Sequence, residues 1–157
     1  MFCVGDKVVY PMYGAGVIES IEDREIHGQL KSYYIMKILD DDMNVMIPVN
    51  STDEAGLRHV VEDSIAHEII RDFKGYEVDM LPNWTKRYRE NMLRLKDGDI
   101  VEVAKVVKGL MVRDKERGLS TGEKKMLNSA RHILISELIL SLNDCEMDIE
   151  NAINFAV

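Results

Sequence analysis

The sequence predicts an α+β protein in which a small antiparallel β-barrel precedes a compact bundle of about five helices. Over the first sixty residues, short runs rich in β-branched and aromatic side chains are separated by Gly and Asp turns, a pattern typical of small barrels. From about residue 64 the apolar residues recur with the 3.6-residue period of helices. We therefore expect a β domain over residues 1–55, a helical domain over 64–157 and a short junction over 56–63.

Five runs are expected to form the strands. The first ends at Pro11, and the second continues through a charged stretch before it reaches a turn at His27-Gly28. An acidic turn, Asp40-Asp41-Asp42, separates the third run from the fourth, and a further turn is expected at Tyr13-Gly14-Ala15-Gly16. The predicted strands are residues 7–10, 16–26, 32–39, 43–49 and, as a short final strand, 57–61.

Two shorter helices come first. Ser64 is expected to cap a helix that runs to about Phe73, and Asn83 is a good N-cap for the next. Gly98 suits the left-handed cap that ends the second of these helices. The positions expected to face inward are Ile65, Ile69 and Phe73 in the first helix and Tyr88, Met92 and Leu95 in the second.

Two longer helices begin at capping boxes. Asp99 stands three residues before Glu102, and Ser120 stands three residues before Glu123, the spacing at which cap and acid satisfy each other's backbone N–H. The first long helix is expected to end before Gly118 and the second at about residue 142. Asn143 or Asp144 is then expected to cap a last short helix that contains Met147, Ile149, Ile153 and Phe155.

The charge of the chain is unevenly distributed. The net charge is −8 over 157 residues, and residues 1–55 carry four Lys/Arg against ten Asp/Glu. Residues 76–132 carry thirteen Lys/Arg against nine Asp/Glu, whereas residues 133–157 hold five acids and no Lys or Arg. Screening limits a charge's reach to roughly 8–10 Å at physiological salt, so the local excess of positive charge matters more than the net value.

The most distinctive segment of the basic region surrounds the single tryptophan, Trp84. It follows the helix-start signal at Asn83, and Lys86, Arg87 and Arg89 come within five residues. An indole beside a helix N-terminus and a basic stripe suits a stacked, anionic polymer. We expect at least two of the three cations to contact phosphate, while the alternatives are a packed tryptophan and a solvated helix face.

Lys124 and Lys125 form a second basic pair, at the start of the longest predicted helix. The helix dipole makes cations unfavourable there, while the free amides of a helix start attract phosphate. Either these two lysines bind phosphate, or they belong to an exposed turn with a small local penalty. No set of Arg, Asn and Gln on one helix resembles a base-reading surface, so we expect DNA binding without sequence specificity.

No catalytic, metal or cofactor motif is present. The four histidines show neither His-x-x-x-His nor Glu-x-x-His spacing, so no metal site is expected. Nucleophile elbow, P-loop and dinucleotide fingerprint are all missing from the sequence. We therefore expect a protein that is not an enzyme and needs no cofactor.

The expected location is the cytoplasm. No run of about 18 apolar residues exists that would predict a membrane span. The N-terminus reaches Gly5 and Asp6 too early for a signal peptide. Cys3 and Cys145 are isolated thiols at opposite ends of the chain, which indicates a reducing compartment.

Two parts of the sequence resemble the CarD/CdnL family of bacterial transcription regulators. The first is Val4-Gly5-Asp6-Lys7-Val8-Val9-Tyr10-Pro11-x-x-Gly14-x-Gly16, with the later Ile47-Pro48; it resembles a module shared with the transcription-repair coupling factor. The second comprises Asn83-Trp84-x-Lys86-Arg87-Tyr88-Arg89 and Arg113-Asp114-x-Glu116-Arg117-Gly118-Leu119-Ser120-x-Gly122-Glu123-Lys124-Lys125-Met126-Leu127. That helical domain is found in the CarD/CdnL branch alone, and the coupling factor carries helicase motifs that this chain lacks.

The resemblance implies a regulator that associates with the nucleoid through RNA polymerase. Its Tudor/SH3-like N-terminal barrel would bind the lobe of the polymerase β subunit through Arg24 and an edge strand containing Val45, Met46, Ile47 and Pro48. Pro48 suits an edge strand because it cannot donate a ladder hydrogen bond. Met46 stands where the family often has a cation, which changes the salt-bridge pattern expected there.

The resemblance also implies a role for Trp84. The tryptophan would enter the minor groove of promoter DNA at the upstream edge of the transcription bubble and stabilise the open complex. Lys86, Arg87, Arg89, Lys124 and Lys125 are the residues expected to contact DNA around it. We expect this regulator to be a monomer. The alternative is a Tudor-like adaptor whose helical domain binds another protein instead of DNA.

Overall fold

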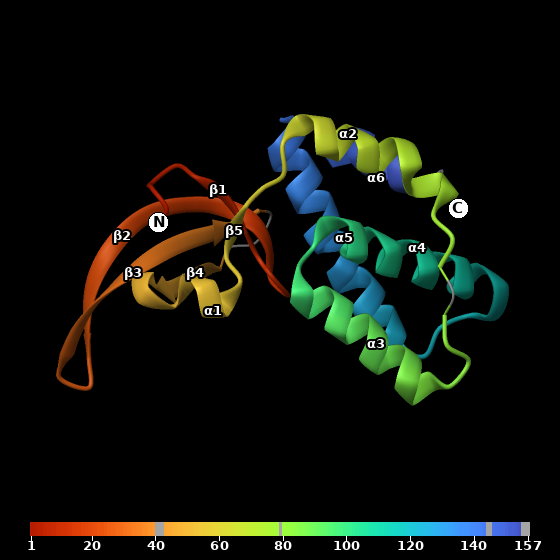
Figure 1. Cartoon of the computed structure of the whole chain (residues 1–157), viewed down its shortest axis with the longest axis horizontal. Coiled ribbons are helices and arrows are strands. Elements are labelled where there is room, and N and C mark those ends of the chain that lie inside the picture. The colour runs from red at the N-terminus through yellow and green to blue at the C-terminus, as the bar shows by residue number, and fades with distance from the viewer. Residues whose placement is uncertain (40–42, 79, 144–145, 155–157) are drawn as a thin grey trace.

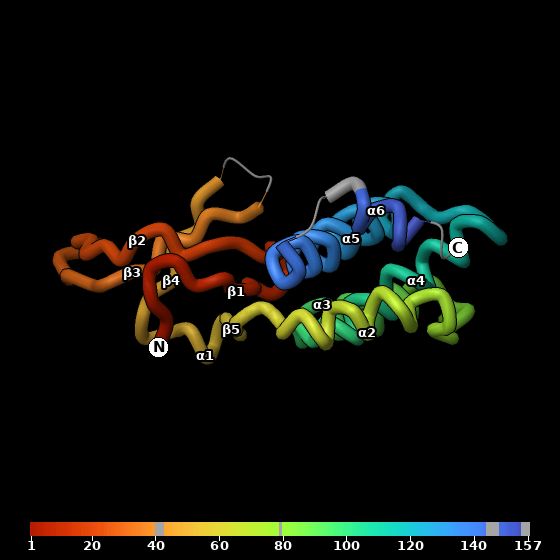
Figure 2. The backbone as a smooth tube through the Cα atoms, turned by 90° about the horizontal axis from the view of Figure 1, so that it is seen from above, coloured from red at the N-terminus to blue at the C-terminus, as the bar shows by residue number. Residues whose placement is uncertain are grey.

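A computed structural model describes residues 1–39, 43–78, 80–143 and 146–154. A curved five-stranded antiparallel sheet lies at one end of the molecule and a bundle of helices at the other (Figures 1 and 2). The predicted α+β class, with the barrel-like sheet before the helices, is confirmed. The predicted acidic turn Asp40-Asp41-Asp42 lies outside the described residues.

The strand order is β4-β3-β2-β1-β5. The predicted hairpin turn is confirmed: His27 and Gly28 have φ of 54° and 75°, as a tight two-residue hairpin loop requires. The turn expected at residues 13–16 lies earlier, because Gly14 already pairs with Tyr10 and Met12 adopts a φ of 77°. The strands are β1 (Lys7–Tyr10), β2 (Gly14–Ile26), β3 (Gln29–Ile38), β4 (Asn44–Pro48) and β5 (Arg58–His59).

Gly16 allows the first part of β2 to approach β3 closely. A Cβ atom at this position would overlap the carbonyl oxygen of Lys37. A β-bulge follows between Ile18 and Ser20, and bulges increase the local twist and bend the strand. Together these features fit the pronounced curvature of β2 in Figure 1.

A short helical passage connects the sheet to the bundle. It consists of η1 (Val49–Ser51) and α1 (Thr52–Ala55), which the sequence patterns did not indicate. Gly56, at φ 73°, ends α1, and the chain then forms β5 beside β1. The short final strand predicted within residues 57–61 is therefore confirmed, and it lies inside the segment predicted as a junction.

Among the described residues, five helices form the bundle, as predicted. They are α2 (Asp63–Asp72), continued by η2 (Phe73–Gly75), then α3 (Trp84–Asp97), α4 (Ile100–Arg117), α5 (Thr121–Leu142) and α6 (Glu146–Asn154). Asn83, Asp99 and Ser120 are confirmed as N-caps, because their side-chain oxygens accept from backbone N–H groups of Lys86, of Val101 and Glu102, and of Glu123. Gly98, at φ 82°, ends α3.

The expected start of α2 is wrong. Glu62 occupies the N-cap position and Ser64 lies within the first turn, so Ala66 faces inward with Ile69 and Phe73 while Ile65 is exposed. Asn143 ends α5 in the left-handed conformation instead of starting the next helix. Asp144 and Phe155 lie outside the described residues.

The two capping boxes are only half formed. Asp99 and Ser120 cap their helices, but the two acids have other partners. The Glu102 carboxylate lies 3.5 Å from Arg94, and both carboxylate oxygens of Glu123 accept from Arg87. Each acid is therefore paired with an arginine of α3 instead of with the backbone N–H of its own cap residue.

Each half of the molecule has its own apolar core. The sheet core is built on Val8, Ile18, Tyr34, Met36, Ile38, Ile47 and Leu57. The bundle core is larger and is contributed by α2 to α6, with Leu134 and Leu138 of α5 fully buried. Because α5 also packs against β2, this helix joins the bundle to the sheet.

Candidate nucleic-acid interface and edge strand

Trp84 is the first residue of α3, and its indole lies against the start of α5. Its Nε1–H donates to Ser120 Oγ at 2.9 Å, and the ring stacks on Tyr88 with centroids 5.1 Å apart and planes inclined by 19°. The side chain nevertheless remains 45% exposed. Trp84 is thus a surface ring held in one orientation.

A buried ion pair joins α3 to α5 close to the indole. Arg87 Nε and Nη2 donate to the Glu123 carboxylate at 2.8 and 2.9 Å, and the two side chains are only 3% and 2% exposed. Arg87 Nη1 donates to the carbonyl oxygens of Leu81 and Pro82 at 3.0 and 3.1 Å. Arg87 therefore fixes the chain that leads into α3.

This ion pair is charged at neutral pH. Hydrogen bonds from Arg87 lower the pKa of Glu123, against the opposing effect of burial, and the charges of Arg87 and Arg113 act in the same direction as the hydrogen bonds. The hydrogen bonds to Glu123 likewise raise the pKa of Arg87. A carboxylate with such a partner stays ionised despite burial.

Four of the predicted DNA-contacting cations gather around Trp84. Lys86 and Arg89 are exposed near the start of α3, and Lys124 and Lys125 are exposed in the first turns of α5. The bond from Trp84 to Ser120 brings these two helix starts together. Within the described part of the chain, none of the four side chains forms an ion pair, so their charges face solvent.

Arg87 does not fit the expectation that it contacts phosphate. Its guanidinium points inward and all three nitrogens are occupied by Glu123, Leu81 and Pro82. The position of Arg87 one residue beyond Lys86 turns it toward the bundle, because adjacent helical residues face different directions. Its observed role is to hold α3 and α5 together.

A shallow apolar groove continues from Trp84 along α3. It has a volume of about 300 Å³, and Trp84, Tyr88 and Met92 follow one another at intervals of one turn along it. Leu93 adds a side chain that is 58% exposed. The lining residues are Trp84, Thr85, Tyr88, Arg89, Met92, Leu93 and Lys96.

The predicted polymerase-binding residues lie on two strands of the sheet. β4 is an edge strand, as expected for Pro48, and it therefore presents unpaired backbone groups. Ile47 is 1% exposed and belongs to the sheet core, whereas Met46 is 41% exposed on the opposite face. The side chain of Ile47 is therefore not at the surface, although its backbone belongs to the edge.

The strand register places Arg24 on the same face of the sheet as Met46 and Pro48. Pro48 pairs with Tyr33, which pairs with Glu22, and Arg24 lies two residues beyond Glu22 on β2. Directly paired residues and every second residue along a strand share a face. Arg24 contacts the Glu22 carboxylate at 2.7 Å, but both side chains are about half exposed, so a partner can compete for Arg24.

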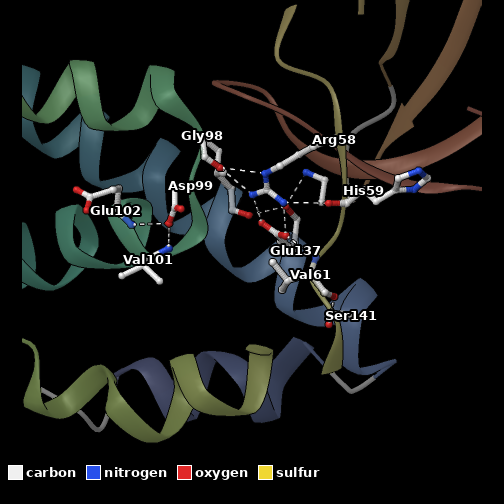
Figure 3. Close-up of polar contacts among 12 residues, drawn as sticks. Arg58, His59, Val61, Gly98, Asp99, Val101, Glu102, Glu137 and Ser141 are labelled. Carbon is white, nitrogen blue, oxygen red and sulfur yellow. Dashed lines mark hydrogen bonds and ion pairs between the residues drawn. The ribbon is translucent and has the colours of Figure 1, made fainter. Parts of the chain in front are cut away.

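A polar network fixes the sheet relative to the bundle (Figure 3). Arg58 of β5 donates to both oxygens of Glu137 on α5 at 2.7 and 2.8 Å, and to the Gly98 carbonyl oxygen at the end of α3 at 2.7 Å. The N–H of Val61 also donates to Glu137, which is 1% exposed. Lys7 of β1 adds a bond to the carbonyl oxygen of Leu140.

Sequence patterns found the surface residues of this region but not the residues that organise them. Ser120 and Glu123 were recognised as a capping box, and nothing in their spacing indicated that they would bind Trp84 and Arg87. Glu137 was hidden within the apolar pattern of the longest helix. A charged residue inside an otherwise apolar helical face was the available signal, because buried charges require a partner.

The described part of the chain offers neither a metal site nor a membrane-spanning helix. Among the described residues, no three His, Cys, Asp or Glu side chains are grouped as metal ligands would be. No helix in the described ranges combines the length and the apolar character needed to cross a bilayer.

Known proteins resemble the chain over nearly its whole length. Residues 2–61 match the family described as CarD-like/TRCF RID domain, and residues 68–154 match the family described as CarD, C-terminal domain. Over 138 residues, 88% of this chain, the sequence is 41% identical to the putative transcription factor YdeB of Bacillus subtilis (strain 168), of which the match covers 90%. The two family matches follow the same order as the sheet and the bundle.

Proposed function

The chain belongs to the CarD family of RNA-polymerase-interacting transcription regulators, and from this premise we propose that it stabilises the open promoter complex. In this proposal the sheet docks on the lobe of the polymerase β subunit, and Trp84 enters the minor groove at the upstream edge of the transcription bubble. The family is one of transcription factors and not of enzymes. The regulator acts as a monomer and recognises DNA structure instead of base sequence.

The observation that carries the proposal is the surroundings of Trp84. Trp84 is 45% exposed and stands where two helix N-termini meet, and Lys86, Arg89, Lys124 and Lys125 are exposed on the first turns of these helices. Helix N-termini and cations both favour phosphate, and a planar apolar side chain can occupy a partly unstacked base step. Arg87 supports this surface from within the bundle and is not among the proposed contacts.

Wedge insertion favours the open promoter for an energetic reason. Separating two stacked bases costs a few kcal/mol, and the duplex beside a bubble is already distorted. Trp84 therefore binds the open complex better than the closed one, and this difference in affinity shifts the equilibrium between them. Phosphate contacts add affinity at either kind of site but little sequence information.

In this proposal, the sheet determines where on the transcription complex the protein binds. Arg24, Met46 and Pro48 share one face of the sheet, and β4 adds a free strand edge, so we assign polymerase docking to this surface. Tethering to polymerase raises the effective concentration of Trp84 at the promoter, which lets weak contacts act there. On free duplex, the same contacts give little binding.

The decisive experiment measures the lifetime of open complexes formed by the host RNA polymerase after challenge with competitor. Trp84→Ala is expected to bind polymerase as wild type does but to lose the lifetime extension. Arg24→Glu is expected to lose both, because it removes docking. Lys74→Gln changes an exposed side chain on η2 that belongs to neither proposed interface, and serves as the matched surface control.

A lifetime extension that survives Trp84→Ala contradicts the wedge. If Trp84→Ala retains the lifetime extension while Leu93→Asp loses it, the apolar groove along α3 binds a protein. That outcome would favour the alternative function of a Tudor-like adaptor over a DNA-contacting regulator.

Salt dependence tests the phosphate contacts separately. Each phosphate neutralised contributes roughly 0.9 to the slope of log K against log[salt]. Removing Lys124 and Lys125 together as glutamines is therefore expected to reduce the slope of the DNA-dependent component by about 2. Lys74→Gln should leave it unchanged, and an unchanged slope for the double variant would remove these lysines from the interface.

A further inference from the structure

We propose that Ser120 positions the Trp84 indole and withdraws its hydrogen-bond donor from DNA, so that the ring meets the minor groove with an all-carbon edge. This inference rests on the proposed function, in which Trp84 enters DNA. It assigns a role in specificity to a residue that is otherwise explained as a helix cap.

The orientation of the ring supports the first half of the proposal. Nε1 donates to Ser120 Oγ at 2.9 Å, and Cζ2, which is separated from Nε1 by the single atom Cε2, lies 3.6 Å from where a Cβ atom at Gly122 would stand. The nitrogen-bearing edge of the indole therefore faces the start of α5. Tyr88 covers one face of the ring, which leaves the other face and the opposite carbon edge as the exposed part.

Ser120 is itself held in place. Its Oγ also accepts the N–H of Glu123 at 3.2 Å, as the N-cap of α5. Glu123 is anchored by its buried ion pair with Arg87, and Arg87 binds the carbonyl oxygens of Leu81 and Pro82 just before Trp84. These contacts connect Ser120, through Glu123 and Arg87, to the backbone that immediately precedes Trp84.

The consequence for DNA recognition follows from the chemistry of the minor groove. Every base pair presents acceptors there, the N3 of adenine and O2 of thymine among them, and a G·C pair adds an N2 donor. A free indole N–H would bond to those acceptors and prefer A·T pairs, which lack the obstructing amino group. With the N–H taken by Ser120, the inserted part of the ring has no polar atom and cannot make this distinction.

The first test follows the ring in the free protein. Ser120→Gly removes the hydroxyl while glycine remains acceptable at an N-cap, and Ser120→Thr keeps both the cap and the acceptor. Because the chain contains a single tryptophan, fluorescence reports on Trp84 alone. Ser120→Gly is expected to raise the acrylamide quenching constant about twofold and to lower the anisotropy, since the side chain is no longer immobilised; Ser120→Thr should match wild type.

The second test follows specificity on polymerase. Open-complex lifetimes are measured on two promoters that differ by an A·T or a G·C pair at the upstream edge of the bubble. Relative to a reaction without the protein, wild type is expected to extend both lifetimes by the same factor. Ser120→Gly should extend both less and favour the A·T promoter by about threefold, the size of one weak hydrogen-bond preference; Ser120→Thr should restore the wild-type pattern.

A second variant covers the case in which Ser120→Gly is poorly folded. Replacing Trp84 by 3-benzothienylalanine keeps the shape of the ring but puts sulfur in place of the N–H, so the bond to Ser120 is lost while Ser120 stays. This ring is expected to show a reduced lifetime extension but no preference between the promoters, because the donor is absent.

The outcomes separate this inference from the proposed function. If Trp84→Ala retains the full lifetime extension, the proposed function fails and the role of Ser120 with it. If Trp84→Ala loses the extension but Ser120→Gly matches wild type in quenching and on both promoters, the positioning role is overturned and the wedge stands. Loss of extension in Ser120→Gly with no change in quenching or promoter preference would also overturn it, because a general structural defect gives that result.

Discussion

At the scale of single residues, the buried pair of Arg87 and Glu123 is the most consequential contact of the helical domain. Both side chains are nearly inaccessible to water, and buried ion pairs add little net stability relative to apolar substitutes. Removing one partner is different, because the other charge then remains buried without compensation. Because this pair holds the two helix starts that carry Trp84 and Ser120, its stability affects the position of the proposed wedge.

Arg87→Met is expected to destabilise the protein by about 3–5 kcal/mol at neutral pH, because Glu123 is left buried and unpaired. Urea denaturation measures the difference. Glu90→Gln is the matched control, since Glu90 lies 3.7 Å from Arg94 in a pair whose acid is 51% exposed. Its expected effect is below about 0.5 kcal/mol, and an equally small effect of Arg87→Met would contradict the assignment.

The same pair predicts a pH dependence of stability. Arg87 lowers the pKa of Glu123 from its ordinary value of 4.5, so the stabilisation is complete above about pH 4.5 and is lost as the pH falls through the lower folded-state pKa. In Arg87→Met, burial raises the pKa of Glu123, and protonation relieves the variant as the pH falls. The stability gap between wild type and variant should therefore narrow in acid; a gap independent of pH would refute the ionised pair.

At the scale of secondary-structure elements, close approach and capping determine how the strands and helices meet. β2 crosses β3 at Gly16, where no side chain fits, and the bulge beyond Ile18 adds curvature. α3 and α5 begin at side-chain caps beside each other, which places their free N–H groups on a common surface. Both features depend on individual residues whose replacement has calculable effects.

Gly16→Ala is expected to destabilise the sheet by about 1–3 kcal/mol, because the added Cβ meets the Lys37 carbonyl and forces the strands apart. Gly75→Ala provides the comparison, since nothing lies within 4 Å of a Cβ at Gly75. It should be neutral or slightly stabilising through its effect on the unfolded chain. Chemical denaturation curves of the two variants that coincide would show that the close approach at Gly16 does not constrain the sheet.

At the scale of the whole molecule, the network around Arg58 connects the proposed docking surface to the proposed wedge. α3 and α5 both start at the Trp84 surface, and both reach the network, through Gly98 and Glu137 respectively (Figure 3). Ser136 reinforces the junction because its Oγ accepts the N–H of Ala15 on β2. The two halves are thus joined by specific polar contacts and not by a flexible linker.

Glu137→Gln is expected to loosen this junction while it preserves the size of the side chain. Arg58 is 30% exposed and can return to water, so the loss of stability should be about 1–3 kcal/mol. Polymerase affinity should stay within about twofold of wild type while the open-complex lifetime falls, because effective concentration depends on geometry. Arg71→Gln, in an exposed pair away from the junction, should change neither quantity; an unchanged lifetime for Glu137→Gln would show that the junction does not position Trp84.

Much of this architecture was predictable from local patterns. Turn and cap residues such as His27, Asn83 and Asp99 act through their own neighbouring backbone, so their roles are visible in the sequence. The surface cations Lys86, Arg89, Lys124 and Lys125 were identified because charge and sequence position suffice to place them on helix starts. Turns, caps and surface charges depend on a few neighbouring residues, so a short stretch of sequence is enough to predict them.

The errors and omissions concern contacts between distant segments. The pairing of Arg87 with Glu123 depends on how α3 and α5 pack, and no spacing rule relates residues 36 positions apart. Ser64 had the chemistry of a cap, but the chain had already entered the helix at Asp63. Short α1 carries too few residues for periodicity to reveal it.

The stiffness of α3 has a consequence for how such a protein finds its place on DNA. From Trp84 to Gly98 the helix rises about 21 Å, roughly the length of six base-pair steps at 3.4 Å each. Arg58 holds Gly98 at one end of the helix and Trp84 stands at the other, so α3 is a rigid spacer of fixed length between them. In the proposed complex, the position of Trp84 along the promoter is then set by its distance from the polymerase. Promoters of unrelated sequence but equal bubble geometry would therefore present the same target.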